Sequence, residues 1–227
     1  MKISTAVIVL SLLGWITLPA NSSAQIEATP LSKLEAHGVQ TASVEYRGHA
    51  AVRLTESAPA DSAPSNDAET LAIVPGLSLQ DGTIEITLSG DTVPTAAPTA
   101  RGFVGLAFRV VDPGHFECFY LRPSNGRAED QLRRNHSAQY ISVPGFPWEK
   151  LRSETPGKYE SYVDLVPGEW TKIKIQVKGS TARLYVNQAE QPTLIVNDLK
   201  QMPVKGGVAL WIGPGTVAHF RDLKVSP

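Results

Sequence analysis

The chain has 227 residues, with 21 basic and 22 acidic side chains and a net charge of −1. This near balance gives no strong basic field, so neither nucleic acid nor an anionic membrane is expected as a partner. Cys118 is the single cysteine, which excludes an internal disulfide and leaves the burial of apolar side chains to stabilise the fold. Because it lies within an aromatic stretch, it is expected to be a small buried residue rather than a nucleophile.

The N-terminus has the pattern of a secretory signal. Residues 1–24 combine Lys2, an apolar run over 3–18 and small residues over 22–24, and this order predicts a cleaved signal peptide. The apolar run is shorter than the roughly 20 residues that a membrane span needs. The mature protein is therefore predicted to be exported, periplasmic or secreted, and not held in a membrane after signal cleavage.

Residues 25–38 form a lead-in before the main body of the protein. Pro30 follows Thr29, a favourable capping residue, so one or two helical turns are predicted over 31–37. The remaining residues, 39–227, show no internal repeat and no domain boundary, and they are predicted to form one domain.

Short stretches of alternating apolar side chains, separated by turn residues, fill this domain. Strands over 39–46 and 49–54 flank Arg47 and Gly48, a pattern typical of a hairpin. Further strands are predicted over 70–74, 83–88, 103–111, 115–122, 138–142, 158–165, 170–177, 181–187, 192–199, 207–213 and 216–225. Loops are predicted over 57–67 and 90–100. The connections are too short for crossover helices, so the fold class is all-β, a two-sheet antiparallel β-sandwich.

The strand predicted over 103–111 has two different faces. One face carries side chains suited to a core: Val104, Leu106, Phe108 and Val110. The other face carries two small residues and one charged residue: Gly105, Ala107 and Arg109. We predict that this second face is a floor on which a ligand rests, with Trp211 on the same side.

Hydrogen-bonding side chains are dense between the strands predicted at 115–122 and 138–142. Binding a sugar requires aromatic faces for the apolar side of the ring and planar polar groups for its hydroxyls. Ten residues are predicted to line such a site: Arg109, Tyr120, Arg122, Asn125, Arg127, Asp130, Arg133, Arg134, His136 and Tyr140. Tyr159 is a further aromatic candidate, Trp148 either faces the ligand or plugs the end of the sandwich, and Trp170 is assigned to the core.

The sequence contains no motif for a cofactor or a metal. It has no glycine-rich phosphate loop, no histidine or cysteine pair at metal-ligand spacing, and no Gly-x-Ser-x-Gly turn. No cofactor and no metal site are therefore assigned.

Carboxyl groups near the polar segment allow two interpretations, catalysis or ion pairing. Glu129 and Asp130 are expected to pair with the neighbouring arginines, Arg127, Arg133 and Arg134. Glu117 alternates with apolar neighbours, so it is predicted to be buried with Arg109 as its partner.

Several strand motifs carry a resemblance to a known superfamily. They are GFVGLAFR (102–109), FECFYLRP (116–123), GEWTKIK (168–174), ARLYVN (182–187), the strand 207–212 and FRDLKV (220–225). With these motifs the chain resembles the concanavalin A-like lectin/glucanase superfamily, and it looks most similar to bacterial exported laminin-G-like and 3-keto-disaccharide-hydrolase-like domains. The resemblance implies a jelly roll whose concave sheet binds carbohydrate.

One motif of that superfamily is missing. The Glu-x-Asp-x-x-Glu strand of laminarinase-type members has no equivalent, since the similar stretch 83–86 contains one carboxyl, Glu85. Calcium occurs in some relatives, but no acidic loop dense enough to hold it is found. The resemblance therefore implies a fold and a ligand class without implying a reaction.

Three interpretations stay open from the sequence. The preferred one is an exported domain that interacts with carbohydrate or another polyol, as a glycan-binding or glycoside-hydrolase-like sandwich. The second is an active glycosidase or sugar lyase that uses Glu117 or Asp130 as acid/base together with His136. The third is a non-catalytic envelope module with a structural or protein-interaction role. The sequence does not decide whether the protein is an enzyme.

Overall fold

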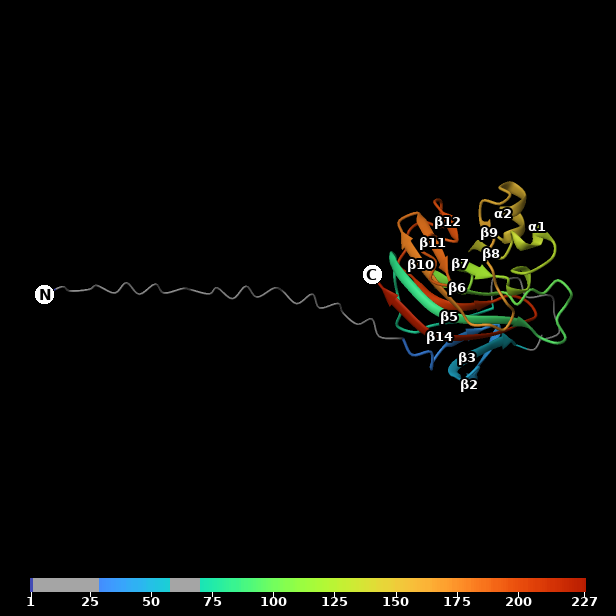
Figure 1. The fold of residues 1–227 in the computed structure, drawn as a ribbon, viewed down its shortest axis with the longest axis horizontal. Helices are drawn as coiled ribbons and strands as arrows, with labels where there is room; N and C mark the ends of the chain where they lie inside the picture. The colour runs from blue at the N-terminus through green and yellow to red at the C-terminus, as the bar shows by residue number, and fades with distance from the viewer. Residues whose placement is uncertain (2–28, 58–69) are drawn as a thin grey trace.

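Short strands joined by turns form two sheets, and these sheets pack face to face (Figure 1). The computed structural model describes residues 1, 29–57 and 70–227. The predicted signal peptide therefore lies outside the described residues except for Met1, and so does the predicted loop over 57–67 except for Ser57.

Each sheet has seven strands, and all of their pairings are antiparallel. The first sheet has the spatial order β1 (Glu35–His37), β4 (Leu71–Ile73), β13 (Gly207–Ile212), β6 (Val104–Asp112), β7 (His115–Leu121), β8 (Ala138–Val143) and β9 (Glu160–Ser161). The second sheet has the order β12 (Leu194–Val196), β11 (Thr181–Val186), β10 (Thr171–Lys178), β5 (Gly82–Thr92), β14 (Thr216–Ser226), β3 (His49–Glu56) and β2 (Val39–Tyr46). The predicted all-β sandwich is thus confirmed.

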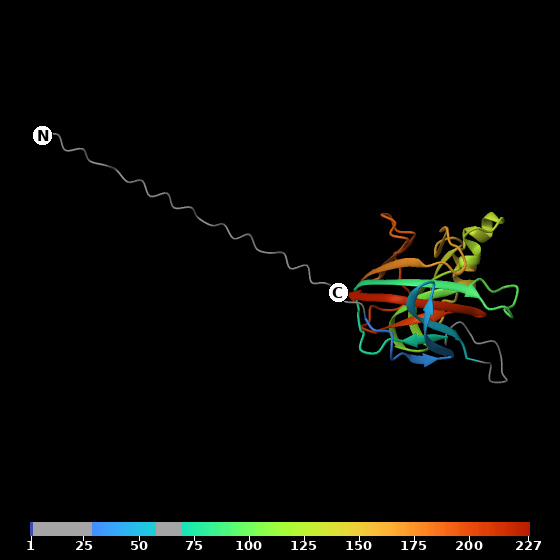
Figure 2. The same ribbon diagram turned by 60° about the horizontal axis from the view of Figure 1, so that its bottom comes forward.

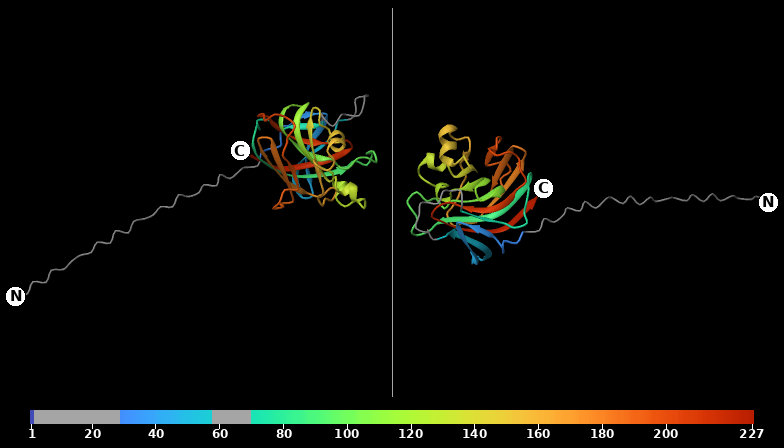
Figure 3. Two further views of the ribbon diagram at one scale, coloured as in Figure 1. Left: turned by 90° about the horizontal axis from the view of Figure 1, so that it is seen from above. Right: turned by 180° about the vertical axis from the view of Figure 1, so that it is seen from behind.

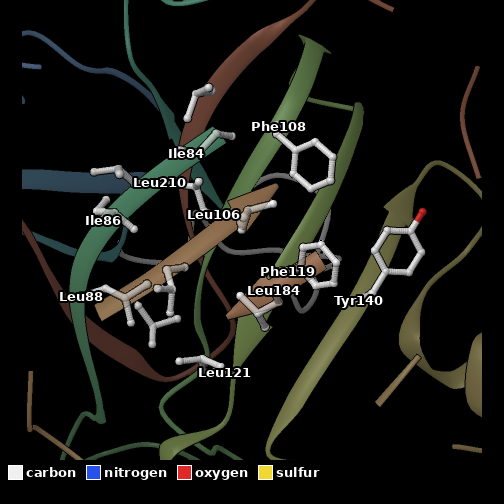
Figure 4. Close-up of a cluster of buried hydrophobic side chains, with 14 of the residues drawn as sticks. Ile84, Ile86, Leu88, Leu106, Phe108, Phe119, Leu121, Tyr140, Leu184 and Leu210 are labelled. Carbon is white, nitrogen blue, oxygen red and sulfur yellow. The ribbon is translucent and has the colours of Figure 1, made fainter. Parts of the chain in front are cut away.

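The main core lies between the sheets. Figure 4 shows Leu106, Phe119 and Leu210 of the first sheet pointing towards Ile84 and Leu184 of the second. All five side chains are buried. Burying a side chain of this size stabilises a fold by about 1.5–3 kcal/mol, so this layer holds the domain together without a disulfide.

The short helices are outside the two sheets. The 3-10 helix η1 (Pro123–Asn125) and the helix α1 (Gln131–Arg134) lie between β7 and β8, and α2 (Trp148–Glu154) follows β8. Both α-helices lie on one side of the molecule, beside β8 and β9 (Figures 1 and 3). On the other sheet, β5 and β14 run side by side (Figure 2). No helix among the described residues is long and apolar enough to cross a membrane.

Several predicted elements can be compared directly with those in the structure. The hairpin of β2 and β3 is confirmed, with Arg47 and Gly48 at positive φ angles of 49° and 74° as a two-residue turn requires. The helical turns predicted over 31–37 are wrong, because part of this segment pairs with β4 as strand β1. The strand predicted over 158–165 shortens to two residues, and helix α2 was not predicted.

A bulge at Arg109 changes the face to which the end of β6 points. Arg109 has a positive φ of 52°, and the register with β7 shifts after Phe108. Because one extra residue reverses the alternation, Val110 joins the outer cluster with Ala107, not the main core. The predicted position of Arg109 on the ligand floor, beside Trp211, is therefore wrong.

The Arg109 guanidinium instead connects the two sheets. It is fully buried and donates to the Gln80 carbonyl at 2.8 Å, the Gly179 carbonyl at 2.7 Å and Asp81 Oδ1 at 3.1 Å. Gln80 and Asp81 precede β5, and Gly179 lies in the turn between β10 and β11. One side chain from the first sheet thus fixes two turns of the second.

Replacing this arginine by a side chain of similar length should destabilise the sandwich. We expect Arg109→Met to lower the free energy of unfolding by about 2–4 kcal/mol. Three hydrogen bonds of the guanidinium are lost, and the one to Asp81 is also an ion pair. Urea denaturation would measure the change. The matched control is Arg183→Met on the exposed side of β11, for which a change within about 0.5 kcal/mol is expected. Equal stability of the two variants would contradict the role of Arg109.

Candidate functional site

The floor of the site is a row of side chains across the outer face of the first sheet. Strand pairing places Leu71, Trp211, Gly105 and Tyr120 side by side on β4, β13, β6 and β7. The rings of Tyr120 and Trp211 approach to 4.8 Å between centroids. Gly105 makes room for this approach, since a Cβ atom there would lie 2.5 Å from the Cβ of Tyr120.

A pocket of about 620 Å³ lies above one end of this floor. Its walls come from the segment after β5, the polar segment between β7 and β8, helix α2 and the turn after β13. Four aromatic side chains line it: Phe103, Tyr120, Trp148 and Trp211. Six charged side chains also line it: Arg101, Arg122, Asp130, Arg133, Glu149 and Arg152. This volume is typical of a site for a small molecule.

The buried carboxylate of Glu160 lies at the centre of the polar groups next to the pocket. Its side chain is only 2% exposed, and Oε1 lies 3.3 Å from Nη1 of Arg122. Nε of Arg152 donates to Oε2 at 3.0 Å, and Nη2 of the same residue contacts Oε1. Glu160 belongs to β9, Arg122 follows β7 and Arg152 lies on α2. One carboxylate therefore joins three segments that are distant in the sequence.

Arg122 is fixed on all sides by further contacts. Its guanidinium donates to the Tyr120 hydroxyl at 2.7 Å, Gln139 Oε1 at 3.2 Å and the His136 carbonyl at 3.1 Å. Two cations approach the indole of Trp148, with the Arg122 Cζ atom 5.6 Å and the Arg152 Cζ atom 4.5 Å from the ring centroid. Contacts of this kind add attraction between a cation and an aromatic face, so the pocket holds Trp148 in one orientation.

His136 lines the pocket beside the same carboxylate. Its Nδ1 atom lies 2.9 Å from Glu160 Oε2, although the angle does not suit a hydrogen bond. Burial lowers the pKa of His136 below its ordinary value of 6.5, the charges of Arg152 and Arg122 lower this pKa further, and Glu160 opposes them. The folded protein therefore favours the neutral ring. Its contribution to stability is present above the ordinary pKa and is lost as the pH falls.

The polar segment between β7 and β8 is organised by caps and main-chain contacts. Asp130 Oδ1 accepts from the main-chain N–H of Arg133 at 3.1 Å and so caps α1. The Arg133 side chain donates to Asn125 Oδ1 at 2.9 Å and to the Ser124 carbonyl at 3.1 Å. Asn125 Nδ2 donates to the His136 carbonyl at 3.1 Å. These bonds hold the segment in place over the floor.

The ion pairs predicted for Glu129 and Asp130 are not found among the described residues. Arg127 pairs with Asp164 at 2.7 Å instead, a contact that lowers the pKa of the Asp164 carboxyl. Arg134 stacks on Tyr162 with its Cζ atom 5.2 Å from the ring centroid. The prediction was wrong because the chain folds the segment against residues after β9, which proximity in sequence does not reveal.

Six of the ten predicted site residues line the pocket: Tyr120, Arg122, Asn125, Asp130, Arg133 and His136. Arg127 and Arg134 lie on the outside of the polar segment, and Arg109 connects the sheets. Tyr140 is buried in the main core. Sequence reasoning did not assign Arg101, Phe103, Glu149 or Arg152 to the site. Their only signal in the sequence was the aromatic or charged character of the side chain.

Glu117 lies between the sheets rather than in the pocket. It accepts from the main-chain N–H of Gln201 at 2.9 Å and from the hydroxyl of Tyr140, and it is fully buried. Burial raises the pKa of Glu117, while these hydrogen bonds oppose the shift; Arg109 contributes only a weaker through-space attraction. The predicted burial is confirmed. Glu117 therefore lies apart from His136, whereas Asp130 and His136 line the same pocket.

No group of three or more potential metal-ligating side chains gathers anywhere in residues 29–57 and 70–227. The groups that line the pocket are mainly guanidinium groups and aromatic rings, which are not metal ligands in proteins. The site can offer hydrogen-bond donors, aromatic faces and positive charge.

Removing the charge of Glu160 should destabilise the protein. Glu160→Gln leaves the buried guanidinium of Arg122 without its counter-ion, and we expect a loss of about 3 kcal/mol in the free energy of unfolding. Glu154→Gln, on the exposed last turn of α2, is the control and should change it by less than about 0.5 kcal/mol. Urea denaturation at neutral pH makes the comparison, and an unchanged Glu160→Gln protein would show that the carboxylate does not hold these segments together.

Comparison with known proteins addresses the fold. No model of a protein family matches the chain, and no curated protein matches it. Among solved structures, a carbohydrate-binding module, CBM66 from Bacillus subtilis, is similar with a TM-score of 0.54 and 11% identity, over 85% of this chain and 98% of that chain. A protein of unknown function with a galectin-like fold, also from Bacillus subtilis, has a TM-score of 0.50 and 13% identity, over 85% of this chain and 87% of that chain. The chain therefore has the concanavalin A-like lectin/glucanase fold that its strand motifs indicated.

Proposed function

We propose that this protein is an exported carbohydrate-binding domain and that its ligand occupies the pocket over Tyr120 and Trp211. The observation that carries the proposal is the combination of aromatic faces and fixed planar donors in one pocket. Sugar rings have an apolar face and a rim of hydroxyls, so they require both kinds of group at once.

The aromatic part of the pocket is preformed. Phe103 packs edge-on to Tyr120 with ring centroids 6.1 Å apart, and Trp148 contacts the guanidinium groups of Arg122 and Arg152. Leu132 on α1 is 67% exposed and lines the same pocket. Rigid aromatic groups cost little conformational entropy when a ligand binds, and an exposed leucine beside them extends the apolar surface.

The polar part of the pocket is equally fixed. Asn125 and Arg133 hydrogen-bond to each other and to the main chain of the polar segment. Planar amide and guanidinium groups whose orientation is set in advance can recognise adjacent hydroxyl groups of a sugar. The solved structure described above as a carbohydrate-binding module has the same fold, which supports this ligand class by analogy.

Binding is preferred to catalysis because of how the carboxylates are engaged. Glu117 is enclosed between the sheets, and Glu160 is engaged by two arginines. Asp130 lines the pocket but uses one carboxylate oxygen to cap α1. A glycosidase needs two carboxyl groups placed on either side of the scissile bond, and the set predicted from sequence does not supply them.

Export forms part of the proposal through the N-terminal sequence. The basic start, the apolar run and the small residues of 1–24 are the pattern of a cleaved signal. A binding domain outside the cytoplasm would meet polymeric or cell-surface glycans.

Truncating Trp148 should abolish most of the binding. We expect Trp148→Ala to weaken the affinity for any glycan that the parent protein retains by at least about tenfold, as expected for a buried aromatic anchor. A glycan array of the mature protein would identify the ligand, and isothermal titration calorimetry would measure the loss. Reducing-sugar release should stay at background for both the parent protein and Asp130→Asn.

Trp170→Ala is the matched control for this experiment. Trp170 packs against Tyr46 and His219 beside the second sheet, with ring centroids 5.4 Å and 6.5 Å away, and does not line the pocket. The Trp170→Ala variant should retain the affinity of the parent protein for the glycan. Equal loss in both variants, or no glycan bound by the parent protein, would overturn the proposed function and favour an envelope module with a structural or protein-interaction role.

A further inference from the structure

Four arginines line the pocket against two carboxylates, with Glu160 as a third carboxylate beside it. The three carboxylates do not pair evenly with the four arginines. Glu160 contacts both Arg122 and Arg152, so one carboxylate already serves two guanidinium groups. This leaves the charges of Arg101 and Arg133 to be accounted for.

Arg101 and Arg133 hydrogen-bond to neutral acceptors. Nη1 of Arg101 donates to the carbonyls of Pro98 at 2.6 Å and Ala100 at 2.7 Å. Arg133 donates to Asn125 Oδ1 and the Ser124 carbonyl, and its link with Asp130 runs through its main-chain N–H. Within the described part of the chain, neither guanidinium forms an ion pair with a carboxylate. Neutral acceptors orient a guanidinium group but do not cancel its charge.

The positive charges also act on one another. The pKa of Arg101 is lowered, first by burial and then by the charges of Arg133 and Arg122. The two segments are connected as well, since the Ser124 N–H donates to the Arg101 carbonyl at 3.2 Å. Two guanidinium groups held near each other in a partly enclosed pocket raise its electrostatic energy. An anion bound beside them would relieve that repulsion.

The aromatic groups restrict what kind of anion fits. Tyr120, Trp148 and Trp211 line the same pocket as both arginines, and a bare inorganic ion would leave these apolar faces unused. The net charge of the whole chain is −1, so the chain has no overall positive charge of the kind that favours binding to nucleic acid.

We propose that the ligand of this pocket is an acidic glycan, with a carboxylate or sulfate group held by Arg101 and Arg133 and a sugar ring resting on the aromatic side chains. The inference rests on the proposed carbohydrate function and narrows it to one substrate class. Carboxylate and sulfate oxygens match the paired N–H groups of a guanidinium, and such charged hydrogen bonds are stronger than those to hydroxyl groups.

The test uses the full mature protein and a glycan array with three kinds of probe. These are uronate-bearing oligosaccharides, the same oligosaccharides with their carboxyl groups reduced to alcohols, and sulfated oligosaccharides. We expect retention of acidic probes and loss of a bound uronate when its carboxyl is reduced. Stronger retention of uronate-bearing or of sulfated probes then identifies which anionic group the ligand carries. Raising the salt concentration should weaken retention, because it screens the attraction.

The variant Arg101→Gln with Arg133→Gln keeps most of the side-chain length and removes both charges. We expect it to bind the retained acidic probe at least about tenfold more weakly. Its thermal unfolding should shift slightly to lower temperature, because Arg133 loses its hydrogen bonds to Asn125 and Ser124. Arg183→Gln, an exposed arginine on β11, is the control for a loss of one surface charge and should bind as the parent does.

The outcomes separate the two proposals. Retention of neutral glycans alone, or of a carboxyl-reduced probe as tightly as its uronate, would overturn the acidic ligand while leaving the carbohydrate function in place. Unchanged affinity of the double variant for an acidic probe would overturn the role of the two arginines. A parent protein that retains no probe would overturn both.

Discussion

The arrangement of the pocket depends on one buried carboxylate. Glu160 lies on a strand of two residues at the edge of the first sheet, yet it holds Arg122 after β7 and Arg152 on α2. Because the acid and the bases would each be costly to bury alone, the three segments stabilise one another's positions. The contacts of Trp148 with both guanidinium groups follow from this arrangement.

The sandwich and the pocket are stabilised by different forces. Apolar side chains from both sheets form the main core, which Figure 4 shows as a continuous layer. The pocket walls instead depend on charged pairs and short caps, such as Asp130 at the start of α1. A rigid sheet that carries polar loops is a common way to place a binding surface. Here it brings a loop after β5, a polar segment after β7 and a helix after β8 into one site.

Sequence reasoning succeeded where local periodicity governs the structure. Alternation in β6 correctly placed Val104, Leu106 and Phe108 in the main core. Sequence reasoning failed at Arg109. A bulge with positive φ reverses the alternation there, and the order of apolar and polar residues does not reveal it. Tyr140 suits a core and a sugar site equally well by residue type. Arg152 could not be assigned, because only the tertiary fold brings α2 to Glu160.

Gly105 gives the pocket a fixed depth. Even a methyl group at this position would press on the main chain and on Tyr120 of the neighbouring strand, so the bottom of the site tolerates almost no variation. Many positions in the loops above it meet solvent on one side and can vary more freely. New ligand specificities would therefore arise through changes in the loops around the pocket, while the floor at Gly105 stays the same.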